Sequence, residues 1–85
     1  MSRPTIRITL YGRSDCHLCH EMRRVVDGVA RAVPLAIEEV DVDGDEALVR
    51  LYGNDVPVLL VNGRKAFKHR VDEQNLRSRL GREPG

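Results

Sequence analysis

The sequence predicts an α/β domain, because strand-like and helix-like segments alternate along the chain. Three observations carry this prediction. Apolar residues recur at every second position over residues 5–11, they recur at helical spacing from residue 16 to about residue 33, and Asn62-Gly63 is a strong hairpin signal between two apolar-rich segments. The expected element order is β-α-β-α-β-β-α, with a four-stranded mixed sheet flanked by three helices.

The first half of the chain contains a strand, a long helix and a second strand. Residues 5–11 form the first strand, and residues 12–15 form the loop after it. The helix then extends from residue 16 to about residue 33 and ends at Pro34, which cannot donate a helical hydrogen bond. Residues 35–42 form the second strand. The helical stripe consists of Leu18, Met22, Val25, Val26, Val29 and Val33.

A short helix is expected next. Asp43 or Asp45 caps its start, because a carboxylate accepts hydrogen bonds from the free N–H groups there, and Gly53 closes it. The apolar residues that it carries are Ala47, Leu48 and Leu51.

The C-terminal part predicts a hairpin and a last helix. Pro57 opens the strand Val58–Val61, and Arg64–Lys68 returns antiparallel as an edge strand. Asp72 caps the last helix, which Gly81 ends.

Length and composition limit the classes of function. The chain has 85 residues, enough for a single domain over residues 1–85, and we expect a monomer. Hydrophobic residues make up 41% and charged residues 32%, with a net charge of +1, so neither nucleic acid nor a membrane is an expected partner. Residues 1–12 lack the apolar core of a secretory signal, which leads us to expect a cytoplasmic location.

The two cysteines carry the clearest chemical signal. In a reducing compartment, a Cys16-x-x-Cys19 pair is suited to redox chemistry or metal binding rather than to a structural disulfide. Cys16 lies at the predicted helix N-terminus, where free N–H groups and the helix dipole stabilise a thiolate, so it is the candidate nucleophile. Cys19 lies one turn further in and can resolve a mixed disulfide. Arg13, His17 and His20 add cationic groups nearby.

The segment YGRSDCHLCHEM resembles the active-site segment of glutaredoxins and glutaredoxin-like proteins, and Val56-Pro57 followed by VLLVNG resembles their Val-Pro turn. The resemblance extends over nearly the whole chain and implies the thioredoxin/glutaredoxin fold. It implies a thiol–disulfide oxidoreductase with Cys16 as nucleophile and Cys19 as resolving thiol. It also implies a cis Pro57 that faces the cysteines.

The resemblance also implies how substrates bind. Val56 offers its backbone to an extended substrate, Arg13 occupies a position that is often basic in glutaredoxins, and His17-Leu18 is the dipeptide between the cysteines. The implied substrates are protein disulfides or glutathione mixed disulfides. Glutathione or a thioredoxin reductase is the implied electron donor, and no cofactor is expected.

Two departures separate this chain from typical glutaredoxins. Phe67 and Lys68 hold the place of a Gly-Gly pair that lets glutathione approach the backbone, so high-affinity glutathione binding is not implied. The dipeptide His17-Leu18 lacks the usual proline. A short glutaredoxin-like group with a Cys-His-Leu-Cys motif is the closer match.

Three other interpretations of the cysteines remain open. Cys16, Cys19 and His20 satisfy the Cys-x-x-Cys-His pattern of covalent haem attachment, although the α/β order and the absence of an export signal disfavour it. The same cysteines and a nearby histidine are able to bind copper or zinc, with His69 as a further ligand. The third alternative is a pair of buried structural cysteines.

Charged residues fall into an acidic stretch and a basic stretch. Each is typical of a solvated face, but the basic stretch follows the strand expected to face substrate and is suited to select an acidic partner or a glutathione carboxylate. The acidic stretch contains Glu38, Glu39, Asp41, Asp43, Asp45 and Glu46, and the basic stretch contains Arg64, Lys65, Lys68, His69 and Arg70.

Overall fold

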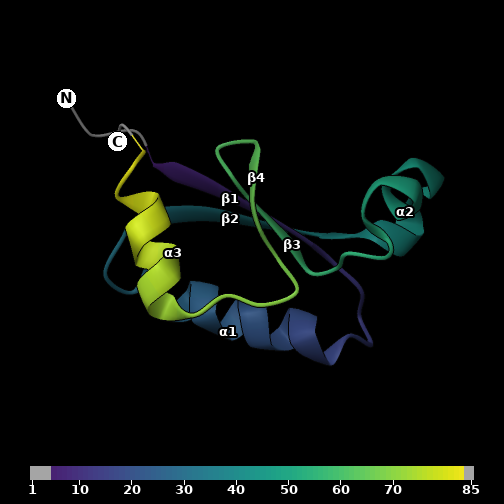
Figure 1. Cartoon of the computed structure of the whole chain (residues 1–85), viewed down its shortest axis with the longest axis horizontal. Coiled ribbons are helices and arrows are strands. Elements are labelled where there is room, and N and C mark those ends of the chain that lie inside the picture. Colours follow the sequence, from purple (N-terminus) through teal and green to yellow (C-terminus); the bar gives the residue numbers. More distant parts are fainter. Residues whose placement is uncertain (1–4, 84–85) are drawn as a thin grey trace.

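Strands and helices alternate in the computed structural model, which describes residues 5–83 (Figure 1). Residues 1–4, part of the segment that suggested a cytoplasmic location, lie outside the described residues. The predicted order is confirmed, with one 3₁₀ helix added. The elements are β1 (Ile6–Gly12), α1 (His17–Ala30), β2 (Leu35–Asp41), η1 (Val42–Gly44), α2 (Glu46–Tyr52), β3 (Val58–Val61), β4 (Arg64–Lys68) and α3 (Glu73–Leu80).

The sheet has four strands in the order β2-β1-β3-β4. β1 pairs parallel with β2 and antiparallel with β3, and β3 pairs antiparallel with β4, so the expected mixed sheet is confirmed. The predicted hairpin turn is present, because Asn62 and Gly63 both have positive φ angles of 50° and 83°. This is the conformation that a tight two-residue hairpin requires.

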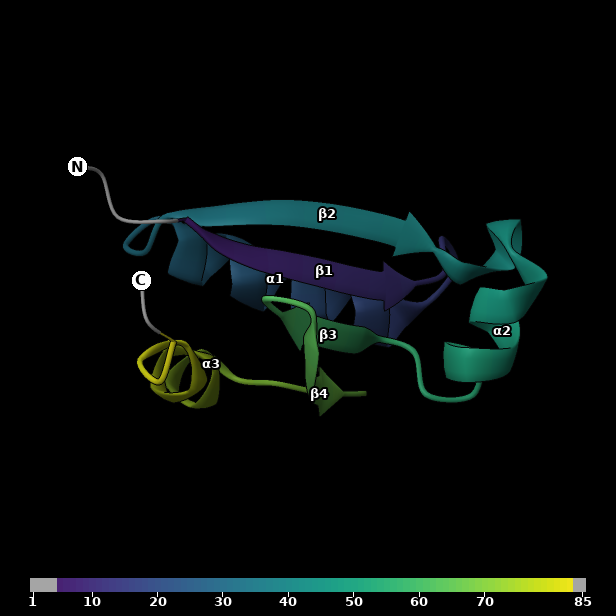
Figure 2. The same cartoon turned by 90° about the horizontal axis from the view of Figure 1, so that it is seen from above.

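Helices α1 and α3 lie on one face of the sheet and enclose the core (Figures 1 and 2). The alternating apolar residues of β1 point toward these helices, as their period-2 spacing predicts. The core residues buried together are Ile6, Ile8, Leu10, Met22, Val26, Val29, Leu59, Val61, Leu76 and Leu80.

Helix α2 lies apart from this core, beyond one end of the strands (Figure 1). None of its residues is buried, and Leu51 is 64% exposed. The helix itself was predicted, but its apolar residues do not pack into the core. Instead, Tyr52 stacks on Tyr11 of β1 with ring centroids 4.5 Å apart, and Asp45 caps the first turn.

Two predicted boundaries are wrong by a few residues. Helix α1 ends at Ala30, before the predicted residue 33. The N–H of Ala32 donates to the carbonyl of Val29 in a tighter turn, and the N–H of Val33 donates to the same carbonyl. The reason is Pro34, which has no N–H to donate to the carbonyl of Ala30. β2 ends at Asp41, because the fully buried Val42 already belongs to η1.

Within residues 5–83, none of the helices has the length and apolar character needed to cross a membrane.

Candidate functional site

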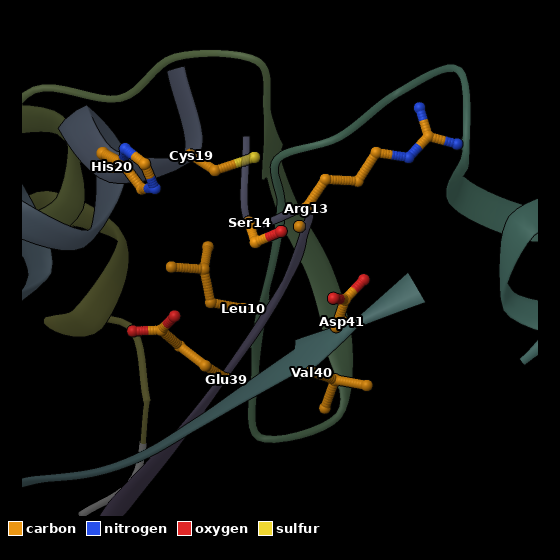
Figure 3. Close-up of a pocket in the computed structure, with 9 residues that line it drawn as sticks. Leu10, Arg13, Ser14, Cys19, His20, Glu39, Val40 and Asp41 are labelled. Carbon is orange, nitrogen blue, oxygen red and sulfur yellow. The ribbon is translucent and has the colours of Figure 1, made fainter. Parts of the chain in front are cut away.

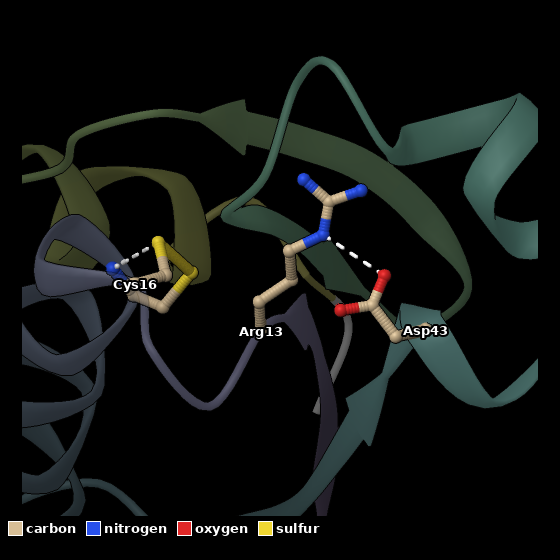
Figure 4. The surroundings of a disulfide bond; sticks show 4 residues. Arg13, Cys16 and Asp43 are labelled. Carbon is tan, nitrogen blue, oxygen red and sulfur yellow. Dashed lines mark hydrogen bonds and ion pairs between the residues drawn. A yellow bond between two sulfur atoms is a disulfide. The ribbon is translucent and has the colours of Figure 1, made fainter.

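Cys16 and Cys19 form a disulfide at the N-terminus of α1, with their Cα atoms 5.2 Å apart (Figure 4). Cys16 is the N-cap residue: its backbone is extended, and its Sγ accepts the N–H of Cys19 at 3.1 Å. A cysteine sulfur therefore takes the position that a serine or aspartate oxygen usually occupies at a helix start. The same N–H would hydrogen-bond a Cys16 thiolate after reduction.

The two sulfurs differ in exposure. Cys19 is only 6% exposed, whereas Cys16 is partly open to solvent. A Cβ atom built on Gly12 would lie 2.9 Å from the Sγ of Cys19, so a side chain there would collide with the sulfur. Gly12, which the sequence did not single out, thus makes room for the inner cysteine.

Pro57 lies at the same end of the sheet. The Val56–Pro57 peptide bond is cis, as predicted. Tyr11 pairs with Val58, and the same register carried one residue further places Pro57 opposite Gly12, the residue against which the Cys19 sulfur rests. Adjacent strands lie about 5 Å apart. This arrangement agrees with a proline close to the cysteine pair, and its contact with the sulfurs stays a prediction.

Arg13 turns away from the cysteines (Figure 4). Its Nε donates to Oδ1 of Asp43 at 3.1 Å, and its Nη2 would lie 3.2 Å from a Cβ atom on Gly53. Arg13 thus joins the loop after β1 to η1 and α2. The predicted stabilisation of a Cys16 thiolate by Arg13 stays untested, and the charge of Arg13 is shared with Asp43.

Of the two residues between the cysteines, the first, His17, faces solvent. The His17 side chain is 83% exposed, and its Nε2 lies 3.1 Å from Oε1 of Glu21 one turn along the helix. Leu18 is half-buried.

The sequence comparison decides the family. A family model described as Glutaredoxin-like domain (DUF836) matches residues 7–81, nearly the entire chain. The chain belongs to this glutaredoxin-like family. A Dictyostelium discoideum protein named "Glutaredoxin-like protein YDR286C homolog" is 32% identical over 78 residues, which cover 85% of this chain and 72% of that protein.

Solved structures agree. The X-ray structure of protein XcR50 from X. campestris is 40% identical to this glutaredoxin-like domain, covers 91% of this chain and 99% of its own, and superposes with a TM-score of 0.76. A mutant thioredoxin from Halobacterium salinarum NRC-1 is 24% identical, covers 94% of this chain and 75% of its own, and has a TM-score of 0.69. The fold is therefore an α/β thioredoxin-like fold.

A hollow of about 280 Å³ opens beside Cys19 in the glutaredoxin-like domain (Figure 3). It lies on the β2 side of the site, because Glu39 pairs with Leu10 and Asp41 pairs with Gly12. The acidic members of its wall were not predicted, although alternation along β2 places them on one face. The lining residues are Leu10, Gly12, Arg13, Ser14, Cys19, His20, Glu39, Val40 and Asp41.

Glu39 at the wall of this hollow is tied to helix α1. It accepts a hydrogen bond from Arg23, which also donates to Asp27 at 2.8 Å. The hydrogen bond to Asp27 raises the pKa of Arg23 above its ordinary value. The charge of Asp27 and the hydrogen bond to Glu39 add to this effect, against the opposing effect of burial. Arg23 thus stays charged and connects β2 to α1.

The turn after β4 bears on glutathione binding. β4 ends at Lys68, and His69 has a positive φ of 67°, a backbone conformation that favours glycine. The residue with left-handed backbone is His69. It directly follows Phe67 and Lys68, the two residues that stand where typical glutaredoxins have a Gly-Gly pair. A histidine side chain stands there in place of open backbone.

The predicted metal alternative has no preformed site in residues 5–83, where no three His, Cys, Asp or Glu side chains gather in a metal-binding arrangement.

Proposed function

We propose that this glutaredoxin-like domain is a thiol–disulfide oxidoreductase that reduces protein disulfides with the Cys16–Cys19 couple. The observation that carries the proposal is the unequal placement of the two sulfurs. Cys16 caps a helix and is reachable from solvent, whereas Cys19 is buried against Gly12. The two sulfurs lie within bonding distance of each other. A dithiol mechanism needs these two environments.

The reaction balances as two thiol–disulfide exchanges. The Cys16 thiolate attacks one sulfur of a substrate disulfide, an S–S bond forms between Cys16 and that sulfur, and the other substrate sulfur leaves as a thiolate that takes up a proton. Cys19 then loses its proton and attacks the Sγ of Cys16, which expels the second substrate thiolate. Two electrons pass from the dithiol to the substrate, and the Cys16–Cys19 disulfide remains.

Residues around the pair supply the proposed substrate contacts. Val56 makes no backbone hydrogen bond to another described residue, so its N–H and C=O are free to pair with an extended substrate segment. Pro57, His17 and Leu18 would border that segment. Arg13 is placed to contribute charge only if it leaves Asp43. We propose a reducing compartment such as the cytoplasm, with glutathione or a thioredoxin reductase restoring the dithiol.

The cysteine variants test this proposal. Cys19→Ser leaves the attacking thiolate but removes the thiol that releases the substrate, so mixed disulfides with Cys16 should accumulate when a protein disulfide is added. Cys16→Ser should abolish the reaction, and the double variant is the control. Mass spectrometry of the trapped adducts and a turnover assay under metal-free conditions provide the measurements.

The same assay separates the alternatives. If Cys19→Ser keeps full turnover of a protein disulfide, the dithiol mechanism is wrong. If it keeps turnover only of a glutathione mixed disulfide, a monothiol mechanism replaces it. If the parent reduces nothing but binds one copper or zinc ion per chain tightly, the metal-binding alternative replaces the oxidoreductase.

Relative thiol reactivity gives an independent test. In the reduced protein, iodoacetamide should alkylate Cys16 faster than Cys19 at neutral pH, because Cys16 is more exposed and caps the helix. Faster alkylation of Cys19 would reverse the two roles.

A further inference from the structure

The two flanks of the cysteine site carry opposite charge. Strand order places β2 and β4 at opposite edges of the sheet, so the acidic stretch and the basic stretch lie on opposite sides of β1 and β3. On the β2 side, Asp41 and Asp43 lie at η1, and Asp43 pairs with Arg13. On the β4 side, Lys68, His69 and Arg70 are all exposed. We call these three residues the basic segment.

The backbone fixes the basic segment beside Pro57. Lys68 pairs with Val58, the N–H of His69 donates to the carbonyl of Pro57 at 2.7 Å, and the N–H of Arg70 donates to the carbonyl of Lys68 at 2.8 Å. Pro57 is one register position from the Tyr11–Val58 pair, which places it opposite Gly12. A chain that passes Val56 and Pro57 on its way to Cys16 therefore also passes the basic segment.

Only part of this positive charge is paired among residues 5–83. Lys68 forms a long ion pair with Asp55, with an Nζ–Oδ1 distance of 3.9 Å, whereas Arg70 forms no ion pair with a described residue. Lys65 further along β4 differs, because its Nζ lies 5.9 Å above the centre of the Tyr52 ring. The basic segment is thus the part of the stretch that is both close to the site and open to a partner.

We propose that the basic segment is a docking surface for protein substrates that carry acidic residues beside their disulfide. This inference rests on the proposed function and names the substrate class of the same site. An acidic protein segment is the partner that fits, because the exposed cations Lys68 and Arg70 lie beside the Val56–Pro57 turn. Opposite charges across the contact speed association and select the partner.

The alternative is a solvated edge, because lysines on an edge strand also prevent strands of other molecules from pairing there. The two explanations differ in one respect. Only docking makes substrate selection depend on the sign of charge at positions 68 and 70.

The test uses the full chain with the double variant Lys68→Glu/Arg70→Glu, and the matched control Arg24→Glu/Arg31→Glu. The control makes the same change in net charge at two exposed residues, one on α1 and one directly after it. The neutral variant Lys68→Gln/Arg70→Gln removes both charges without reversing them, so it shows whether a loss in the first variant comes from misfolding. Two disulfide peptides of equal length serve as substrates, one with aspartates and one with lysines beside the cysteines.

Binding and turnover are measured separately. Binding is followed by fluorescence anisotropy with peptides in which serine replaces cysteine, so this readout does not depend on redox chemistry. Turnover is followed as kcat/KM for the disulfide peptides. Charge reversal at positions 68 and 70 should lower both affinity and kcat/KM for the acidic peptide on the order of tenfold, the neutral variant should lie between, and added salt should shrink the difference.

Each outcome decides one proposal. Equal losses in the control variant, or no loss in any variant, overturn the docking surface and leave the oxidoreductase intact if turnover persists. Charge-dependent binding without turnover supports the docking surface and overturns the proposed function. If charge reversal slows only reduction of a glutathione mixed disulfide, the basic segment serves the glutathione carboxylates, and the proposal for acidic proteins is wrong.

Discussion

Helices α1 and α2 both begin near the site, but they are held in the structure by different means. α1 buries Cys19, Met22, Val26 and Val29 in the protein interior, whereas α2 buries none of its residues and leaves Leu51 64% exposed. The cysteines are thus attached to an element that the core positions. α2 is held by its cap, by the stacking of Tyr52 on Tyr11 and, through η1, by the contact of Arg13 with Asp43.

The largest expected effect separates the two helices directly. Met22→Ala should lower the free energy of unfolding by about 2–5 kcal/mol, because it removes a side chain that is 1% exposed and leaves a cavity. Leu51→Ala, the matched apolar truncation on α2, should change it by less than about 0.5 kcal/mol. Urea unfolding followed by circular dichroism measures both. Similar losses would mean that α2 contributes to the core after all.

A medium effect is expected where α1 meets β1. Gly12→Ala should cost about 1–3 kcal/mol, because the new methyl group would lie 2.9 Å from the Cys19 sulfur and must displace it. Resolution of mixed disulfides should slow as well, since the sulfur that moves is the one proposed to resolve them.

Gly44→Ala is the control for Gly12→Ala. A Cβ atom at Gly44 meets nothing within 4 Å, so unfolding should change by less than about 1 kcal/mol. Thermal unfolding and single-turnover release of a trapped substrate measure the two effects. If Gly12→Ala changes the free energy of unfolding as little as Gly44→Ala does, Cys19 is not packed tightly against Gly12.

The smallest effect concerns the cap of α2. Asp45→Ala removes the carboxylate that accepts the N–H of Ala47 at 2.8 Å, and should cost about 1 kcal/mol. Because α2 lies outside the core, the change should appear as faster hydrogen exchange in residues 46–52 with little change in α1. Hydrogen exchange detected by mass spectrometry checks this. Faster exchange in both helices would show that they unfold together.

The sequence predicted what short-range patterns control. Alternating Ile6, Ile8 and Leu10 gave the first strand, and Asn62-Gly63 gave the hairpin, because both signals depend on neighbouring residues. The helix start at Cys16 was also predicted, with Cys19 one turn further along the helix.

Contacts between distant residues were not predictable in this way. The partner of Arg13 is Asp43, which is 30 residues away and becomes its neighbour only when η1 forms after β2. Gly12 gave no signal because its importance depends on where Cys19 packs. The exposure of Leu51 was not predictable for a related reason: a short helix beyond the end of the sheet has no core to face.

The exposure of His17 makes this position a convenient attachment point for a spectroscopic probe. The side chain lies on the first turn of α1, between the two cysteines in sequence, and its Nε2 contacts Glu21 of the same helix. A fluorescent or spin-labelled amino acid introduced there would replace the contact with Glu21 and one proposed substrate contact, but it would not enter the packing of Cys19 against Gly12. Because it lies within one helical turn of both sulfurs, such a probe would report reduction and re-formation of the disulfide.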